Sequence, residues 1–271
     1  MEDKTEGIAR QGKLTTYFVS KDSIVRRIWG NGDTILLIFA GASAEFALNK
    51  AVDWLYFTGR LPSEPLKRLF STVSYARQIV FAEQENAMCA IDKISAIHKE
   101  VEDKRGQNIP DWAYRDVLSM LIDYSIRSYE LLERKLSISE KEEIYHVFKR
   151  VGARMRLKEL PADYDHWLLM RASGLHENMT NGPFTGDLYR QYRRHLGWFR
   201  FLILKHVQTI LVPEKVNELL SLRKSPFATA MLGIYKFSGV IGVKSWLKNA
   251  ILPSAYRKEV NALDGYSHRS S

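Results

Sequence analysis

Apolar side chains recur every three or four residues along nearly the whole chain, and no run of strict apolar–polar alternation bounded by turn residues is found. This pattern is typical of amphipathic helices that bury their apolar faces against one another. The sequence therefore predicts an all-α protein of about ten helices. No linker is long enough to divide the 271 residues, so we expect a single domain over 1–271, with loosely ordered tails at 1–19 and 264–271.

The apolar residues also limit the class of protein. A hydrophobic fraction of 45% excludes an intrinsically disordered chain. The best apolar run, residues 35–48, is too short to span a membrane and is interrupted by Glu45. The charged N-terminus leads into no signal-peptide region, and a single cysteine, Cys89, excludes an internal disulfide. We expect a soluble, cytoplasmic protein.

Capping residues predict where several helices begin and end. Asp33 is the expected N-cap of a long buried helix over 34–58. Ser139 with Glu142 predicts a capping box for a helix that runs to about residue 156. Further helices are expected over 84–103 and 186–211.

Positive charge is concentrated near the C-terminus, where residues 187–258 hold 13 basic and 3 acidic side chains. Such an excess predicts either an anionic partner or a solvated basic face. Residues 188–205 interleave arginines with aromatic side chains, as nucleic-acid binders do, but no helix-turn-helix or RNA-binding motif accompanies them, so nucleic acid is disfavoured. Residues 227–252 are apolar on most sides with three lysines on one stripe, which fits a membrane interface or a helix packed on the core. A peripheral contact with an anionic membrane through 187–258 therefore stays open.

His98 lies on an apolar helical stripe. Its companions are Ala87, Ile91, Ile94 and Val101, at successive spacings of four and three residues, so His98 is expected to point into the core. Buried polar groups usually find a hydrogen bond, and a core histidine satisfied in this way is one interpretation. An apolar wall with one histidine is also what an axial haem ligand requires.

A second stripe, on the preceding helix, carries mostly polar groups: Arg68, Thr72, Tyr75 and Ile79. It borders an apolar face, so it can line a cavity and offer donors to an oxygen species or a carboxylate. A simple boundary between core and solvent would give the same pattern.

Other constellations are weaker. Glu143-x-x-His146 and Asp163-x-x-His166 resemble halves of a di-iron motif, but the two further glutamates that such a bundle needs are not found in suitable order. His206 falls on an apolar stripe and is expected in the core. Nucleophile-elbow, dinucleotide and phosphate-loop motifs are missing.

Four ordered segments resemble a known family: EPLKRLFST at 64–72, AIHKEV at 96–101, DYSIRSYE at 123–130, and YHVFKRVG at 145–152 followed by LP at 160–161. They resemble the catalytic domain shared by the fungal endoplasmic-reticulum oxygenase MpaB and the bacterial rubber oxygenase called latex clearing protein. The resemblance covers about residues 22–220.

The resemblance implies a haem b in a globin-like helical core, with His98 as the proximal iron ligand. It implies a distal helix that carries the catalytic residues Arg68, Ser71 and Thr72 near bound dioxygen, with Arg68 also binding the cofactor. It further implies an oxygenase that acts with dioxygen on an unsaturated hydrophobic substrate, isoprenoid- or lipid-like, with cleavage of a C=C bond as one outcome.

The chain departs from the rubber oxygenases at three positions near these residues. Ser71 replaces a lysine, and Ser95 and Glu102 replace arginines that flank the histidine. Two alternatives therefore stay open: a haem-free relative that binds a hydrophobic ligand, and an adaptor that uses the basic C-terminal third at a membrane surface or on nucleic acid.

Overall fold

The computed structural model describes residues 16–57, 65–222 and 233, without the side chains of Leu55, 65–70 and Val73. Within these ranges the regular structure consists of ten helices and contains no strand, which confirms the all-α prediction. The helices are α1 (Ile24–Trp29), α2 (Gly32–Leu48), α3 (Val52–Phe57), α5 (Pro65–Phe81), α6 (Gln84–Arg105), α7 (Asp111–Leu132), α8 (Ile138–Arg154), α9 (Tyr164–Glu177), α10 (Pro183–Leu211) and α11 (Glu214–Leu219).

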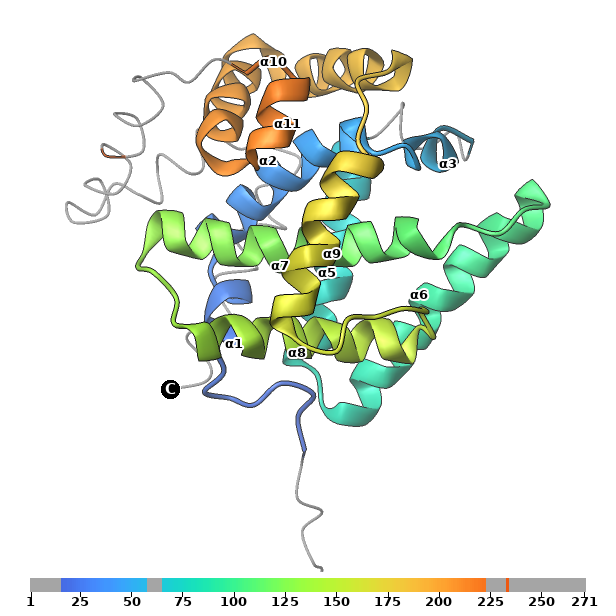
Figure 1. The fold of residues 1–271 in the computed structure, drawn as a ribbon, viewed down its shortest axis with the longest axis vertical. Coiled ribbons are helices and arrows are strands. Elements are labelled where there is room, and N and C mark those ends of the chain that lie inside the picture. The colour runs from blue at the N-terminus through green and yellow to red at the C-terminus, as the bar shows by residue number, and fades with distance from the viewer. Residues whose placement is uncertain (1–15, 58–64, 223–232, 234–271) are drawn as a thin grey trace, which may run out of the picture.

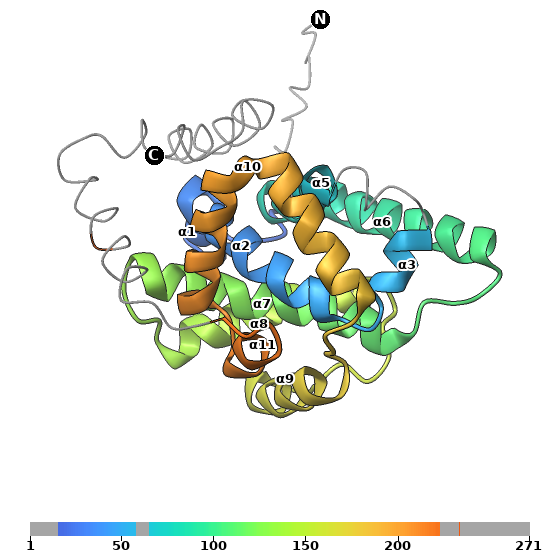
Figure 2. The same cartoon turned by 90° about the horizontal axis from the view of Figure 1, so that it is seen from above.

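Helix α2 forms the centre of the bundle. Helices α7 and α10 pack against it on different sides, α8 packs below α7, and α5 pairs with α6 (Figures 1 and 2). The position follows from the composition of α2, which is almost entirely apolar and buries most of its side chains. No helix in the described ranges is long and apolar enough to cross a bilayer.

Buried polar groups on the surrounding helices bond across the interfaces. The indole of Trp29 donates to the Ser125 hydroxyl at 3.1 Å, and the indole of Trp167 donates to Ser119 at 3.2 Å. On the other side of α2, the Gln208 amide donates to the Ala40 carbonyl at 3.1 Å. These bonds satisfy the indole donors of Trp29 and Trp167 and the side-chain amide of Gln208 where the helices meet.

The helix predicted over 34–58 is two helices, because the chain breaks at Asn49. Asn49 adopts an extended backbone and its side-chain oxygen accepts the amide of Ala51 at 2.8 Å. Its side-chain nitrogen donates to Asp116 on α7 at 2.8 Å. The N-cap of α2 is Asn31 rather than Asp33, since the Asn31 side chain accepts the amides at positions 33 and 34.

The capping box of α8 is two residues earlier than predicted. Ser137 accepts the amide of Glu140, and the Glu140 carboxylate accepts the amide of Ser137, whereas Ser139 only shares a hydroxyl hydrogen bond with Ser137. Helix α10 begins at Pro183, three residues before the predicted start. It kinks at Gly197, whose φ of 75° is a left-handed conformation that favours glycine.

The stretch predicted as an N-terminal tail ends in the core. Phe18 and Val19 are buried, and the amide of Phe18 donates to the carbonyl of Ala82 at 3.1 Å. The side chain of Arg150 bonds to the carbonyl of Phe18. Residues 1–15, the predicted helix over 227–252 and the predicted tail 264–271 lie outside the described residues, apart from residue 233.

Candidate functional site

Helix α6 carries His98 out of the core. Ala87 and Ile91, in its first half, are fully buried, while Ile94, His98 and Val101 are half-buried. The C-terminal half of α6 extends beyond the neighbouring helices in both views (Figures 1 and 2). The predicted stripe is therefore present, but it leaves the core after Ile91, and His98 lies on its partly open section.

An aromatic side chain borders His98. The ring of Tyr114, in the first turn of α7, meets the imidazole edge to face, with 5.1 Å between the ring centroids and 76° between the planes. The Tyr114 hydroxyl donates to the Glu102 carboxylate at 3.2 Å. Burial, and then the charge of Glu102, raise the pKa of the Tyr114 phenol well above its ordinary value. The phenol thus stays a protonated donor, and its hydrogen bond holds the ring against His98.

Two of the three departures from the rubber oxygenases have local structural roles. Glu102 also accepts the amide of Ile109 at 2.9 Å, which closes the connection from α6 to α7. Ser95 donates to the carbonyl of Ile91, one turn earlier, at 3.2 Å. The side chains at these positions are thus engaged with their own helix and its connector.

Arg105 lies seven residues after His98 and so on the same face of α6. Its guanidinium covers the ring of Trp54 at 3.9 Å and pairs with Asp53 at 2.8 Å, both on α3. Its Nη1 atom is buried and has no hydrogen-bond partner among the described residues. A buried guanidinium nitrogen of this kind can form a hydrogen bond with an anionic group. The seven-residue spacing from His98 was the signal by which the sequence could have revealed Arg105.

Helix α5 holds the predicted distal residues and packs beside α6. Ser71 is half-buried and Thr72 is exposed, while the side chain of Arg68 lies outside the described atoms. Further along the predicted polar stripe, Tyr75 is half-buried and Ile79 is buried. The stripe therefore runs from the surface into the core on the helix next to His98.

The candidate di-iron residues have other roles. Glu143 accepts a hydrogen bond from Ser23, and His146 is exposed. Asp163 is the N-cap of α9 and pairs with the ring of His166 at 2.7 Å. Among residues 16–57 and 65–222, no three His, Cys, Asp or Glu side chains are grouped so as to hold a metal ion. His206, predicted in the core, is half-buried.

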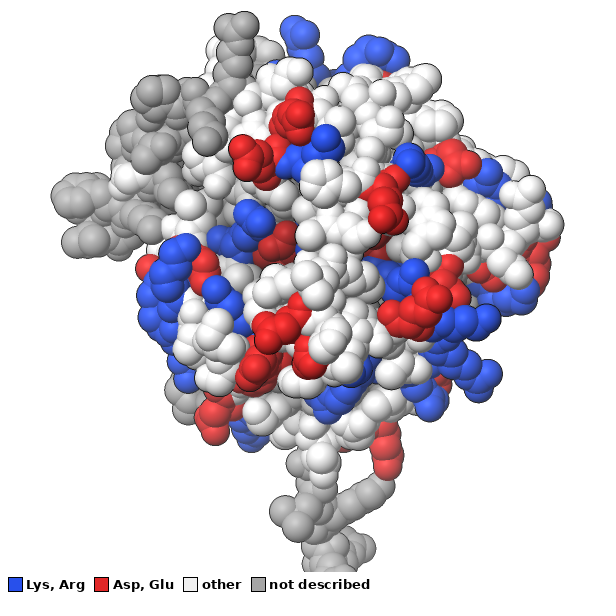
Figure 3. All heavy atoms as spheres, in the orientation of Figure 1, with Lys and Arg blue, Asp and Glu red and all other residues white. Residues whose placement is uncertain are grey.

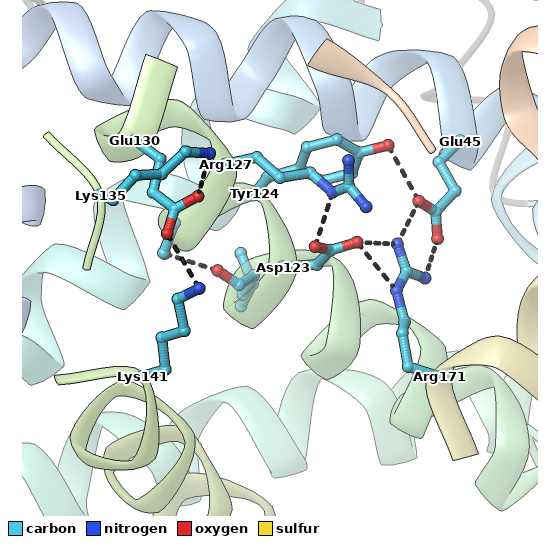
Figure 4. Close-up of polar contacts among 10 residues, drawn as sticks. Glu45, Asp123, Tyr124, Arg127, Glu130, Lys135, Lys141 and Arg171 are labelled. Carbon is cyan, nitrogen blue, oxygen red and sulfur yellow. Dashed lines mark hydrogen bonds and ion pairs between the residues drawn. The ribbon is translucent and has the colours of Figure 1, made fainter. Parts of the chain in front are cut away.

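A buried charge network, which sequence reasoning missed, joins α2, α7 and α9 (Figure 4). Arg171 lies between Glu45 and Asp123. It bonds to both carboxylate oxygens of Glu45, at 2.6 Å for Nη2–Oε2, and to Asp123 at 2.9 Å. Tyr124 donates to Glu45 at 2.9 Å, and Arg127 donates to Asp123 at 2.7 Å.

The charged groups of this network bond mainly to one another. Burial alone would lower the pKa of Arg171, but the charges of Glu45 and Asp123 outweigh it and raise that pKa well above its ordinary value. Each carboxylate has several donors, so the network has little capacity for a ligand. In the sequence, the sign of this network is Glu45, because it is the single charged residue in an apolar run.

A second buried carboxylate lies beside this network. Asp116 on α7 accepts the side-chain amides of Asn49 at 2.8 Å and Asn178 at 3.0 Å. Burial raises the pKa of Asp116 to about 6, although both amide hydrogen bonds act to lower it. The Asp116 carboxylate thus connects the break between α2 and α3 with the end of α9 through these two hydrogen bonds.

Comparison with known proteins identifies the family. The family model described as "ER-bound oxygenase mpaB/B'/Rubber oxygenase, catalytic domain" matches residues 26–241. No curated protein and no solved structure gives a significant match. The matched segment includes α5, His98 and the charge network. The chain belongs to the family of the ER-bound oxygenase mpaB/B′ and rubber oxygenase catalytic domain.

Proposed function

We propose that this chain is a haem b-dependent oxygenase that uses dioxygen to oxidise or cleave an unsaturated hydrophobic molecule, isoprenoid- or lipid-like. Membership of an oxygenase family supports the reaction class. The observation that carries the haem assignment is the half-buried imidazole of His98, on an apolar stripe that ends beside an aromatic wall.

The residues around His98 fit the chemical parts of a haem. A single imidazole suffices as the protein's iron ligand. Ile94, Val101 and the ring of Tyr114 offer apolar surface for a porphyrin face. The buried, unpartnered Nη1 of Arg105, two helical turns from His98, would pair with a propionate.

The roles of the protein follow from these positions. A bound haem supplies the activation of dioxygen. His98 would hold the iron through a neutral ring nitrogen, while Tyr114, fixed by Glu102, limits rotation of that ring. On α5, Arg68 and Thr72 would donate hydrogen bonds where negative charge develops on oxygen, with the smaller Ser71 leaving space beside them.

The test of the reaction uses the full chain reconstituted with haemin, a reductant, dioxygen and squalene as the probe alkene. We expect carbonyl products detectable by mass spectrometry. Arg68→Ala and Thr72→Ala should each lower the rate about 10²–10³-fold, the usual effect of removing one such donor, with haem content unchanged. Ser74→Ala, an exposed hydroxyl on the same helix, is the matched control. Equal rates in all variants would contradict the assigned roles, and a haem-loaded chain inactive on every isoprenoid alkene would contradict the substrate class.

A haem-free function is the second candidate, because Glu102 places a carboxylate one turn from His98 where rubber oxygenases have an arginine. In that case the chain would use the same fold to bind a lipid-like ligand. Organic extraction of the purified protein followed by mass spectrometry decides between the two. A stoichiometric lipid without porphyrin would favour the binding module.

A further inference from the structure

The kink in α10 exposes a cluster of large apolar side chains. Trp198 and Phe199 follow directly after Gly197, and Leu202 lies three residues further on; they are 69%, 55% and 43% exposed. The Trp198 and Phe199 rings lie edge to face, 5.9 Å between centroids. Leu202 is one helical turn further on, so the three side chains form one patch. Exposed apolar clusters of this kind mark interaction sites more often than isolated exposed residues do.

The surroundings of this patch are basic. Arg193, Arg194 and Lys205 are exposed, and Arg200 lies between them. No acidic residue occurs anywhere in the sequence over 188–213. Figure 3 shows Lys and Arg side chains projecting along the upper edge of the molecule, over α10. We call residues 193–205 the α10 corner.

We propose that the α10 corner docks onto an anionic lipid surface. Tryptophan, phenylalanine and leucine at a protruding bend can enter the boundary between headgroups and acyl chains, where tryptophan is enriched. The flanking arginines and lysine would remain at the level of the anionic headgroups, and each cation near such a surface favours binding. A nucleic acid would use the charges and the two rings but would gain little from an exposed leucine. The proposal does not depend on haem or on catalysis.

Helix α9 provides an internal contrast. Leu169 is 72% exposed, more than any of the three residues of the patch. The cation nearest to it in sequence, Arg171, is buried in the charge network, and the first turn of the helix carries Asp165. An exposed leucine whose nearest cation in the sequence is buried should not bind an anionic surface, which makes Leu169 the matched control.

The experiment is co-sedimentation of the full chain with vesicles of phosphatidylcholine alone or with about 30% phosphatidylserine, a strongly anionic mixture. We expect binding to the anionic vesicles that weakens with added salt. The pair W198A/F199A should bind on the order of tenfold more weakly through lost apolar burial. The pair R193Q/R194Q should bind about 30-fold more weakly and with a smaller salt dependence. Leu169→Ala should bind like the parent.

Three outcomes would overturn the proposal. The first is equal binding by the parent and both paired variants. The second is a lowered melting temperature of W198A/F199A with vesicle binding unchanged, which would mean that another part of the chain covers the patch. The third is tight, W198A/F199A-sensitive binding to single-stranded RNA in the absence of any vesicle binding.

Discussion

Polar side chains are satisfied to different degrees in the charge network around Arg171 and on the face of α6 that carries His98. In the network, Glu45, Asp123 and Arg171 are buried and bond to one another in several directions. On α6, His98 is half-buried with a ring for a neighbour, and Arg105 keeps a nitrogen without a partner among the described atoms. The polar groups of the network satisfy one another, whereas the α6 face has a buried donor to which we propose that a ligand bonds.

This difference distinguishes the charge network, which has a structural role, from the α6 face, which carries the candidate site. A saturated buried network fixes the relative positions of three helices, because removing one member leaves a charge uncompensated. A buried polar group without a partner costs stability, so its retention calls for an explanation such as a bound ligand, an ion or an ordered water. Substitutions in the network should therefore affect stability most, and substitutions on α6 should affect ligand binding most.

The largest effect on stability is expected from Arg171→Met. Methionine leaves Glu45 buried without its cation and leaves Asp123 with Arg127 alone, which should lower the free energy of unfolding by about 3–5 kcal/mol. Urea unfolding monitored by circular dichroism measures this change. The control is Arg154→Met, which breaks a solvent-exposed pair with Asp92 and should change the stability very little. Similar costs for the two variants would remove the distinction between the network and a surface pair.

The next effect concerns pH, through Asp116. Its folded pKa of about 6 lies above the ordinary value of 3.8, so between those values the folded chain binds more protons than the unfolded chain. Stability should therefore fall as pH rises from 4 to 7, by about 2–3 kcal/mol from this group. Asp116→Asn keeps an acceptor for Asn49 and Asn178, so it should remove this fall. A stability difference between parent and variant that does not change with pH would contradict the raised pKa.

A smaller effect is expected from Gly41→Ala, at the contact of α2 with α7. An added Cβ would lie 2.2 Å from the ring of Tyr124. That ring is buried and its hydroxyl is held by Glu45, so it cannot move aside freely. We expect a loss of about 1–3 kcal/mol in urea unfolding. Gly186→Ala, where the added carbon meets only the end of a flexible arginine, is the control. Full stability of the first variant would show that the α2–α7 contact is looser than described.

The smallest effect on stability is expected from Tyr114→Phe. The change keeps the aromatic wall beside His98 but removes one hydrogen bond to Glu102, at a cost of about 0.5–1.5 kcal/mol. A clearer change should occur in haem binding, because the ring beside His98 is less firmly held. A haem titration of this variant that matches the parent in affinity and spectrum would mean that the hydrogen bond serves the α6–α7 connection alone.

The helical class could be predicted from sequence because periodicity is a local signal summed over many residues. Boundaries were less accurate where a distant residue decides them. The side chain of Asn49, at the break, bonds to Asp116, sixty-seven positions away, and the sequence around Asn49 does not reveal this partner. At α8, Ser137 and Ser139 offer similar capping patterns, and the geometry at residue 137 decides between them.

The candidate site, like the helix boundaries, could be predicted from the sequence only in part. The stripe identified the side of α6 on which His98 lies, but the exposure of that side depends on where the neighbouring helices end. The partners of Glu45 come from α7 and α9, so only the anomaly of one charge in an apolar run was visible in the sequence. The roles of Arg68, Ser71 and Thr72 stay predictions.

The central claim is that His98 holds a haem, and absorption spectroscopy of the full chain titrated with haemin tests it most directly. The parent should give a sharp Soret band that shifts on reduction and with carbon monoxide. His98→Ala should lose this band while circular dichroism stays unchanged, and His166→Ala, an exposed histidine on α9, should behave like the parent. A His98→Ala protein that keeps its haem with an unchanged spectrum would contradict the account.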